Sequence, residues 1–433
     1  MTISLPFLTS YDPPGTSEGS LDPLGLYQIA DQLATLLVPA VRERMQRIRF
    51  LTAMAVGALV CEGLDDDPGK RDASPYLVWE WLVVEALICH GAGSGAIWGV
   101  PGTLVARRTR GQHGYLDARS YLKTPRIFGF HGVYKRLATH LGLVDVHLGS
   151  GPDAEGLVDA WARDRGLGRF EDARKTVVKK WSKAVERSLA EAPPRTKPGW
   201  DTEAWQELAT AFDPSGCRAR EKRWLRDALT AGGERRLGAL PTIWSLQADA
   251  QDDELPEETL HDRLETQEPS YGPLLAAIRA YEGFARHLQD AFDVLKADAS
   301  RQDASGYVVP NIASDADFKQ CVSGLDRRFE TAHRTLGNVI LANAPLQSLF
   351  HRRFAAFGEP TDPERCALLL CSHHEAVQRA KSAEGKRPWF DRIGPERISV
   401  RHAYREEPRE LRLDRYLHTY RGRPVRQFYG DLT

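Results

Sequence analysis

The stretch from His373 to Lys386 holds the residues of this chain whose types and spacing are best suited to catalysis. His373, His374 and Glu375 are consecutive, and Lys381 and Lys386 follow within the same short stretch. A carboxylate can bind Mg²⁺, and a lysine can position an attacking water molecule. This combination indicates a metal-dependent nuclease as one candidate function.

The spacing within the stretch argues against that nuclease. Glu375 and Glu384 are nine residues apart, and at about 100° per residue they lie on opposite sides of a helix. His373 and His374 are adjacent, so their side chains point about 100° apart. A nuclease metal site needs carboxylates that converge on the ion. The sequence therefore favours a non-catalytic role and predicts neither a metal nor a cofactor.

The six cysteines provide no complete metal or redox motif either. None of them forms a C-x-x-C pair, which is the spacing of zinc sites and of redox-active thiols. Cys366 and Cys371 precede His373 and His374, but the second half of a zinc site is missing. Buried thiols on a helix are the favoured interpretation.

A helix-turn-helix pattern stands between residues 117 and 142. A short helix is expected to end near Lys123, and Pro125 marks the turn. A second helix is predicted from Phe130 to Leu141, since Val133 and Leu137 recur with Leu141 on one face. The order of these elements is typical of a recognition helix that enters a DNA major groove.

The residues that follow extend this pattern to a winged helix. Leu143–Leu148 is predicted to be extended, and Gly149–Asp153 is rich in turn residues. The helix Tyr76–Ile88 is apolar nearly all round, which predicts that it is buried. We take this buried helix as the first helix of a winged-helix domain that spans residues 74–165.

Positive charge is concentrated in the same region. From Leu104 to Arg136 there are eight Lys or Arg residues and one acid, Asp117, whereas the formal net charge of the whole chain is −1. A basic segment in a nearly neutral chain indicates an anionic partner, and its basic residues would contact phosphate. The residues predicted to contact nucleic acid are Arg107, Arg108, Arg110, Lys123, Arg126, Lys135, Arg136, Thr139 and His140. Thr139 and His140 would reach base edges.

The chain as a whole is predicted to be mainly α-helical and multi-domain, with a small α+β region at its C-terminal end. The expected segments are a helical segment over 1–73, the winged helix over 74–165, a helical domain over 166–300, and a helical and α+β domain over 301–433. Within the last, Arg397–Tyr404 alternates like a strand. Residues 379–426 hold fourteen Lys or Arg, seven acids and several aromatic residues, which suit either a second nucleic-acid surface or a solvated cap.

The composition excludes several classes of protein. Hydrophobic residues make up 42% of the chain and charged residues 27%, as in ordinary globular proteins. No apolar run approaches the roughly 18 residues of a membrane span. The first residues lack the basic start and apolar core of a signal peptide. The expected location is therefore the cytoplasm, away from membranes.

Three strings of the sequence carry a resemblance. They are TPRIFGFHGVYKRLATHLGLVD, HHEAVQRAKSAEGKRPWF and YRGRPVRQFYGDL. Together they resemble uncharacterised proteins of bacterial genome-defence islands. The resemblance covers about a third of the chain and implies a subunit of an anti-phage or DNA-handling complex. It assigns no role to any single residue.

These observations predict a protein that binds nucleic acid, with duplex DNA the favoured ligand, as a non-catalytic subunit of a bacterial multi-protein defence system. Two alternatives remain open. The first is a scaffold or adaptor that uses the same helices to contact other proteins. The second is the metal-dependent nuclease near His373–Lys386.

Overall fold

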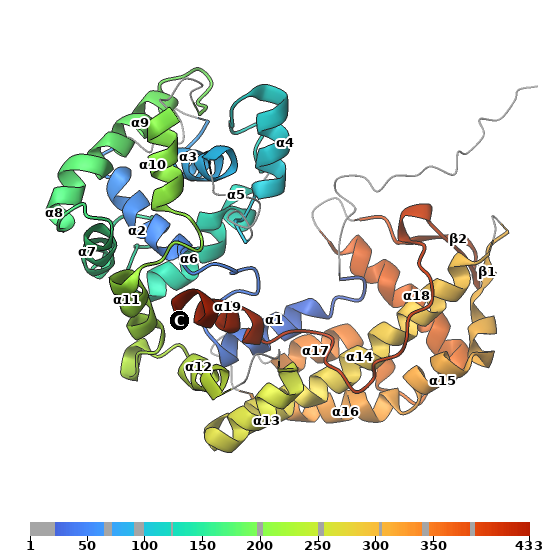
Figure 1. The fold of residues 1–433 in the computed structure, drawn as a ribbon. Helices are drawn as coiled ribbons and strands as arrows, with labels where there is room; N and C mark the ends of the chain where they lie inside the picture. Colours follow the sequence, from blue (N-terminus) through green and yellow to red (C-terminus); the bar gives the residue numbers. More distant parts are fainter. Residues whose placement is uncertain are drawn as a thin grey trace, which may run out of the picture. The chain divides into compact units, whose positions relative to one another are not determined.

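The structure is a computed structural model, and it describes residues 22–64, 72–90, 99–122, 124–196, 202–249, 255–302, 305–339, 346–381 and 386–433. It is mainly helical, with one small antiparallel sheet near the C-terminal end, as the sequence predicts (Figure 1). The chain divides into two compact units. Unit 1 comprises residues 1–34 and 256–419, and unit 2 comprises residues 35–255 and 420–433. Among the described residues, no helix is long and apolar enough to cross a membrane.

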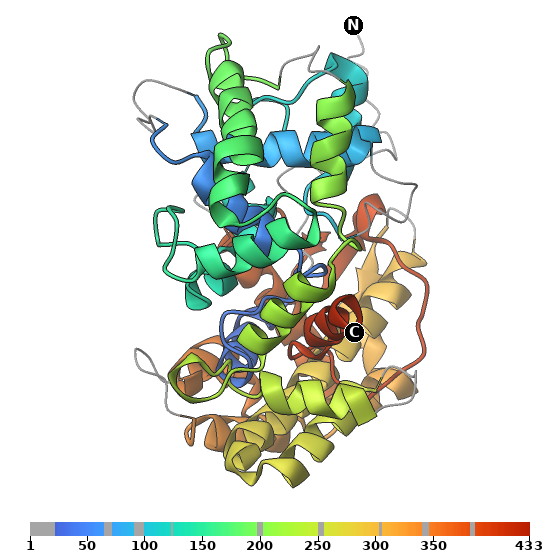
Figure 2. The ribbon, with the colours of Figure 1, turned by 60° about the vertical axis from the view of Figure 1, so that its left-hand side comes forward.

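Unit 2 is a helical assembly around two buried helices. Its helices are α2 (Phe50–Val60), α3 (Pro75–His90), α4 (Thr103–His113), α5 (Pro125–Phe128), α6 (Phe130–His140), α7 (Ala154–Asp164), α8 (Phe170–Ala173), α9 (Lys179–Leu189), α10 (Thr202–Ala211), α11 (Ala219–Leu229), α12 (Leu240–Asp249) and α19 (Gly422–Leu432), with the π-helical turn η1 (Arg174–Val178) and the 3₁₀ turn η2 (Gly233–Arg235). Every residue of α2 is buried. Helices α9 and α10 both pack across α3 (Figure 2).

The core of unit 2 is rich in tryptophan. Trp79, Trp161 and Trp181 surround Phe212, and all four side chains are buried. The indole Nε1 of Trp79 donates to the Ala53 carbonyl at 3.0 Å. That contact requires a glycine at position 57, because a Cβ there would lie 2.4 Å from Nε1 of Trp79. Large aromatic side chains and close backbone approach therefore fix how α2 and α3 meet.

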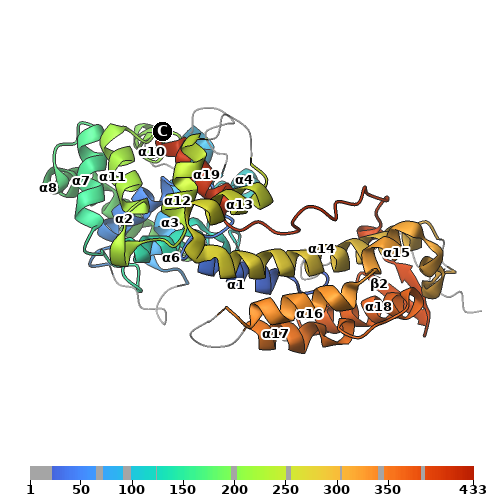
Figure 3. The ribbon, with the colours of Figure 1, turned by 90° about the horizontal axis from the view of Figure 1, so that it is seen from below.

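Unit 1 is built on one long helix. Its helices are α13 (Glu257–Gln267), α14 (Gly272–Ser300), α15 (Ala316–Val322), α16 (Leu325–Leu336), α17 (Leu346–Phe354) and α18 (Pro363–Arg379), with 3₁₀ turns η3 (Pro269–Tyr271), η4 (Val309–Ser314), η5 (Ala355–Phe357) and η6 (His402–Tyr404). Helix α1 (Tyr27–Leu37) begins in unit 1. Helices α15, α16 and α18 pack against α14 (Figure 3).

The sheet of unit 1 has the order β1-β3-β2 and is antiparallel throughout. Its strands are β1 (Tyr307–Val308), β2 (Phe390–Gly394) and β3 (Arg397–Val400). The predicted strand over Arg397–Tyr404 is present as β3, but it ends at Val400 and a 3₁₀ turn follows. The α+β character expected of the C-terminal region is confirmed.

The winged helix is not confirmed. The predicted second helix is present as α6, with Leu137 fully buried. Helix α4 ends at His113, not near Lys123, because Gly114 adopts a left-handed conformation with φ of 78°. The turn predicted around Pro125 is the short helix α5 instead. Asp117 then stabilises a turn by accepting hydrogen bonds from the backbone N–H groups of Arg119 and Ser120. Lys123 lies outside the described residues.

The wing itself is replaced by a tight turn. One isolated bridge joins Val144 to Ser150, and no strand forms in this fully described stretch. The carboxylate of Asp145 accepts hydrogen bonds from the backbone N–H groups of His147 and Gly149. These local bonds compete with a strand ladder. Helix α7 follows directly, and α6 packs along α2.

Candidate functional site

Helix α6 presents one buried face and one exposed face. Phe130, Val133 and Leu137 are buried on the inner face. On the same side, the hydroxyl of the buried Tyr134 accepts the backbone N–H groups of Gln46 at 3.0 Å and Arg47 at 2.9 Å. These two bonds hold the segment 41–49 beside α6. A segment that is remote in sequence thereby becomes part of the surface around this helix.

The exposed face of α6 is basic, and residues of that remote segment extend it. Gly132 and Arg136 are one turn apart, and Arg136 is exposed. The guanidinium of Arg42 donates to the Gly132 carbonyl at 3.5 Å. Arg44 is exposed and lies over the Phe128 ring, 4.6 Å from its centroid. We call Arg42, Arg44 and Arg136 the basic face of α6.

Helix α4 keeps only part of the charge predicted to contact nucleic acid. Arg107 and Arg108 are exposed. Nε of Arg110 instead pairs with Oε1 of Glu85 at 2.9 Å. Glu85 is nearly buried, and burial raises the pKa of its carboxyl while the charge of Arg110 lowers it. Arg110 therefore neutralises a buried carboxylate of α3 and is not available as a phosphate contact.

The other predicted contacts differ in how accessible they are. Lys135 donates from Nζ to the Val146 carbonyl at 2.5 Å. The hydroxyl of Thr139 is buried, which removes it from the surface that would reach bases. His140 is exposed, and its Nε2 lies 3.3 Å from the Arg235 carbonyl oxygen. The side chain of Arg126 lies outside the described residues.

A second feature of unit 2 is a buried pair formed by Glu80 of α3 and His131 of α6. The Glu80 side chain is fully buried, and its Oε2 accepts hydrogen bonds from Nδ1 and from the backbone N–H of His131. Its Oε1 accepts the Tyr121 hydroxyl at 2.9 Å. Burial raises the pKa of Tyr121 well above its ordinary value, so the phenol remains a donor. Gly129 is required beside this carboxylate, since a Cβ there would lie 2.1 Å from Oε1.

His131 of this pair lines a cavity of about 1050 Å³. Its walls come from the end of α2, the beginning of α3, helix α6 and the turn at 146–150. His131 and Lys135 line it from successive turns of α6, and Ser74 and Tyr76 line it from the start of α3. The volume lies at the upper end of ligand pockets, which are roughly 300–1,000 Å³.

Neither Glu80 nor His131 was singled out by the sequence analysis. The signal was nevertheless present, because Glu80 and Glu85 are carboxylates inside the otherwise apolar helix α3. A buried carboxylate requires a partner. The structure shows the two partners to be His131 and Arg110.

The stretch His373–Lys386 of unit 1 is held in place by hydrogen bonds. His374 is fully buried, its Nδ1 donates to the Pro23 carbonyl at 3.0 Å, and its Nε2 accepts the Trp389 N–H at 2.9 Å. Burial lowers the pKa of His374 to about 3, and the charge of Lys381 contributes to this shift. The ring is thus neutral with both nitrogens in use, and it has no lone pair left for a metal.

The side chains of Glu375 and Lys381 are also engaged in hydrogen bonds. Oε1 of Glu375 accepts Nε of Arg392 at 2.6 Å, and its Oε2 accepts Nη2 of Arg379 at 3.2 Å. Lys381 donates to the Asp22 carbonyl. Glu384 lies outside the described residues. Within the described part of the chain, no three His, Cys, Asp or Glu side chains are placed to hold a metal ion. The stretch fastens α18 to residues 22–24 and to β2.

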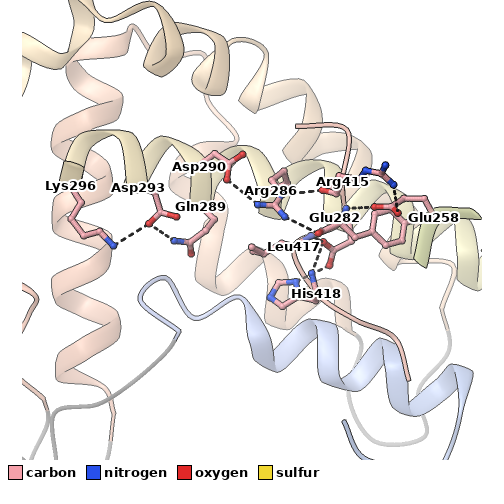
Figure 4. A network of polar contacts seen from close by, with 11 residues as sticks. Glu258, Glu282, Arg286, Gln289, Asp290, Asp293, Lys296, Arg415, Leu417 and His418 are labelled. Atoms are coloured by element: carbon pink, nitrogen blue, oxygen red, sulfur yellow. Dashed lines mark hydrogen bonds and ion pairs between the residues drawn. The ribbon is translucent and has the colours of Figure 1, made fainter. Parts of the chain in front are cut away.

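The basic C-terminal region also has a structural role where it crosses α14 (Figure 4). Glu282 is nearly fully buried and accepts hydrogen bonds from the backbone N–H of Leu417 at 2.6 Å and from Nδ1 of His418 at 2.8 Å. Arg286 donates to the carbonyl of Arg415 at 3.0 Å and pairs with Asp290 at 3.1 Å. An irregular segment is thereby tied to a helix through side chains.

The aromatic residues of this region are largely unavailable for stacking on bases. Trp389 and Phe390 are buried in unit 1, and Tyr404 stacks on Trp389 with ring centroids 5.0 Å apart. Tyr420 and Phe428 are buried in unit 2. Single-strand binding surfaces present exposed aromatic rings. Of the two interpretations of residues 379–426, the structural cap is therefore favoured.

Comparison with known proteins gives no relative to guide the assignment: no family model, curated protein or solved structure matches this chain. The function has to be argued from the α6 face and the Glu80–His131 cavity.

Proposed function

We propose that unit 2 binds nucleic acid through the basic face of α6. The observation that carries this proposal is that Arg136 is exposed on α6, that Arg42 of the remote segment 41–49 reaches the Gly132 carbonyl of the same helix, and that Arg44 lies over Phe128 of the adjoining short helix α5. Cations grouped on one face attract a polyanion and release its counterions. Arg107 and Arg108 on α4 add exposed positive charge to the same unit.

The support comes from charge rather than from fit to a DNA groove. The described residues provide no two-stranded wing, so both duplex DNA and RNA are ligands to be tested. The preference for duplex DNA, the cytoplasmic location and the membership of a bacterial multi-protein defence system are the parts of this proposal that the sequence alone motivates.

The test is a binding titration with the double variant Arg44→Ala/Arg136→Ala. If both side chains contact phosphate, affinity for a short duplex falls by roughly 1–3 kcal/mol. The slope of log K against log salt becomes shallower by about 0.9 per lost contact. Fluorescence anisotropy over a range of salt concentrations measures both quantities.

The matched control is Arg327→Ala/Arg334→Ala, which removes the same charge from exposed positions on α16 of unit 1. We expect this control to bind like the native chain. Equal losses in the two double variants would mean that net charge alone drives binding. An unchanged affinity in the folded Arg44→Ala/Arg136→Ala protein would remove the α6 face from the interface.

A protein-binding adaptor is the second candidate, and one observation favours it. Leu104 of α4 is 83% exposed, and Val146 and Phe128 are 63% and 42% exposed. Exposed apolar side chains of this size often mark protein contacts. An adaptor would assemble with its partner in salt concentrations that dissociate a nucleic-acid complex, because burial of apolar area is little weakened by salt.

A further inference from the structure

The His131 ring is oriented as a general base rather than as a structural tie. Its Nδ1 and its own backbone N–H both bond to Oε2 of Glu80. With the Nδ1 proton directed to a carboxylate, the lone pair of a neutral imidazole is on Nε2. Nε2 makes no hydrogen bond to any residue that the structure describes, and the ring lines the cavity.

The carboxylate behind the ring is held by other elements. Glu80 is on α3, and Tyr121, whose hydroxyl it accepts, is outside any helix. A buried carboxylate that is fixed in this way keeps the imidazole in one tautomer and stabilises the imidazolium that forms when Nε2 takes a proton. A general base, His131, is therefore present at the cavity wall, and the carboxylate that orients it, Glu80, lies behind it.

A cation stands one turn farther along the same helix. Lys135 lines the cavity with His131, and one of its three protons is donated to the Val146 carbonyl. The other two protons remain available for an anion. The N-terminus of the sixteen-residue helix α3 also faces the cavity through Ser74 and Tyr76, and its dipole favours negative charge there. Glu62 and Asp72 also line the cavity, and Glu62 pairs with Arg174 at 2.7 Å. The base, the ammonium group and the helix N-terminus together suit a phosphate group on the wall formed by α3 and α6.

We propose that this cavity cleaves RNA by transphosphorylation, an inference that rests on the proposed binding of nucleic acid by unit 2. Nε2 of His131 takes the proton of a ribose 2′-hydroxyl, and the 2′-oxygen forms a bond to the adjacent phosphorus. The bond from phosphorus to the 5′-oxygen of the next nucleotide breaks, and that oxygen takes a proton from water. His131 returns its proton to solvent. The products carry a 2′,3′-cyclic phosphate and a 5′-hydroxyl, and Lys135 stabilises the charge that develops on phosphate.

The side chains that line the cavity favour this reaction over hydrolysis of DNA. They supply two imidazoles, His131 and His147, one ammonium group and the carboxylates of Glu62 and Asp72, and no three metal-ligating side chains of the described chain are placed to hold a metal ion. In RNA the nucleophile is already attached beside the phosphorus, so the reaction gains the advantage of an intramolecular attack. DNA lacks this hydroxyl.

The experiment uses the full chain and a single-stranded RNA of mixed sequence, labelled at its 5′ end, in buffer with EDTA. We expect fragments with 2′,3′-cyclic phosphate ends and no cleavage of DNA of the same sequence. A single 2′-deoxy substitution at a mapped cleavage position should abolish cleavage at that position. This substrate control requires no protein variant and so does not depend on folding.

His131→Asn tests the base, because the Asn amide can still donate to Glu80 but cannot accept the substrate proton. We expect its rate to fall roughly 10²–10⁴-fold, and Lys135→Ala to slow the reaction about tenfold or more. The matched control is His402→Asn, an exposed histidine of unit 1, which should keep the native rate. Thermal melting establishes whether each variant is folded.

Binding of the same RNA is measured separately by anisotropy. RNA that binds but is not cut would overturn the cleavage proposal and leave nucleic-acid binding intact. RNA that neither binds nor is cut, together with no binding of duplex DNA, would overturn both. Equal cleavage by native protein and folded His131→Asn, or products with 5′-phosphate ends, would also exclude this mechanism.

Discussion

His374 in unit 1 and His131 in unit 2 are both buried imidazoles on helices, and they differ in the use of their second ring nitrogen. His374 donates from Nδ1 to the Pro23 carbonyl and accepts the Trp389 N–H at Nε2. His131 bonds through Nδ1 to Glu80, and its Nε2 has no partner among the described residues. Both ring nitrogens of His374 form hydrogen bonds within the fold, whereas Nε2 of His131 can still bind a proton or a ligand.

This difference shows that residue type and burial do not identify a catalytic histidine. The stretch with the more reactive composition, around His373–Lys386, uses its groups to fasten chain segments together. The functional candidate is the histidine whose partner is a carboxylate and whose open nitrogen borders a cavity. Unfilled hydrogen-bonding capacity beside a cavity is more informative than a cluster of polar residues.

The largest effect on stability is expected from Glu80→Ala. The change leaves three buried donors without an acceptor, namely the Tyr121 hydroxyl and two N–H groups of His131. Orphaned buried donors and the loss of a buried charged partner cost about 3–5 kcal/mol together. Urea denaturation followed by circular dichroism measures the loss. Glu80→Gln keeps an acceptor oxygen and should lose less than half as much; equal losses would mean that the hydrogen bonds are not the cause.

A somewhat smaller loss is expected from His374→Ala. The variant loses two hydrogen bonds and the stacking of the ring on Phe292, whose centroid is 4.9 Å away. Removal of a buried ring with two hydrogen bonds costs about 2–4 kcal/mol. The same urea denaturation measures it. His402→Ala, at an exposed position of the same unit, should stay within about 0.5 kcal/mol of the native chain.

The smallest effect separates the two histidines by pH. Burial lowers the pKa of His374 to about 3 in the folded chain, against about 6.5 when unfolded. The unfolded state therefore binds the extra proton first, and the stabilisation present above pH 6.5 is lost progressively as the pH falls toward 3. From pH 6 to pH 5 the native chain should lose about 1 kcal/mol more than His374→Asn. Parallel losses in the two proteins would contradict a neutral His374.

Local sequence patterns predicted those parts of the fold that depend on neighbouring residues. The second helix of the motif was predicted at its observed position with the correct buried face, from the spacing of Val133, Leu137 and Leu141. Alternation at residues 397–400 gave β3. Helical and strand periods are properties of consecutive residues, so a sequence displays them directly.

The same patterns failed at positions where a side-chain hydrogen bond to the nearby backbone, or a residue remote in the sequence, determines the structure. Residues 143–148 do not form the predicted strand, because the Asp145 side chain stabilises a turn there. Arg110 was assigned to phosphate, but its guanidinium pairs with Glu85 on another helix. Arg42 and Arg44 became part of the α6 surface through the Tyr134 hydroxyl. Nothing in a residue's immediate neighbours reveals such contacts.

The sequence by itself determined that this protein is mainly helical, that positive charge gathers between residues 104 and 136, and that α3 is buried. Only the tertiary structure decided which charges remain exposed and which imidazole keeps an open nitrogen. Glu80 and His131 are 51 positions apart, and they meet because α3 and α6 both pack against α2. A buried carboxylate must find a partner, but the fold selects which one it finds.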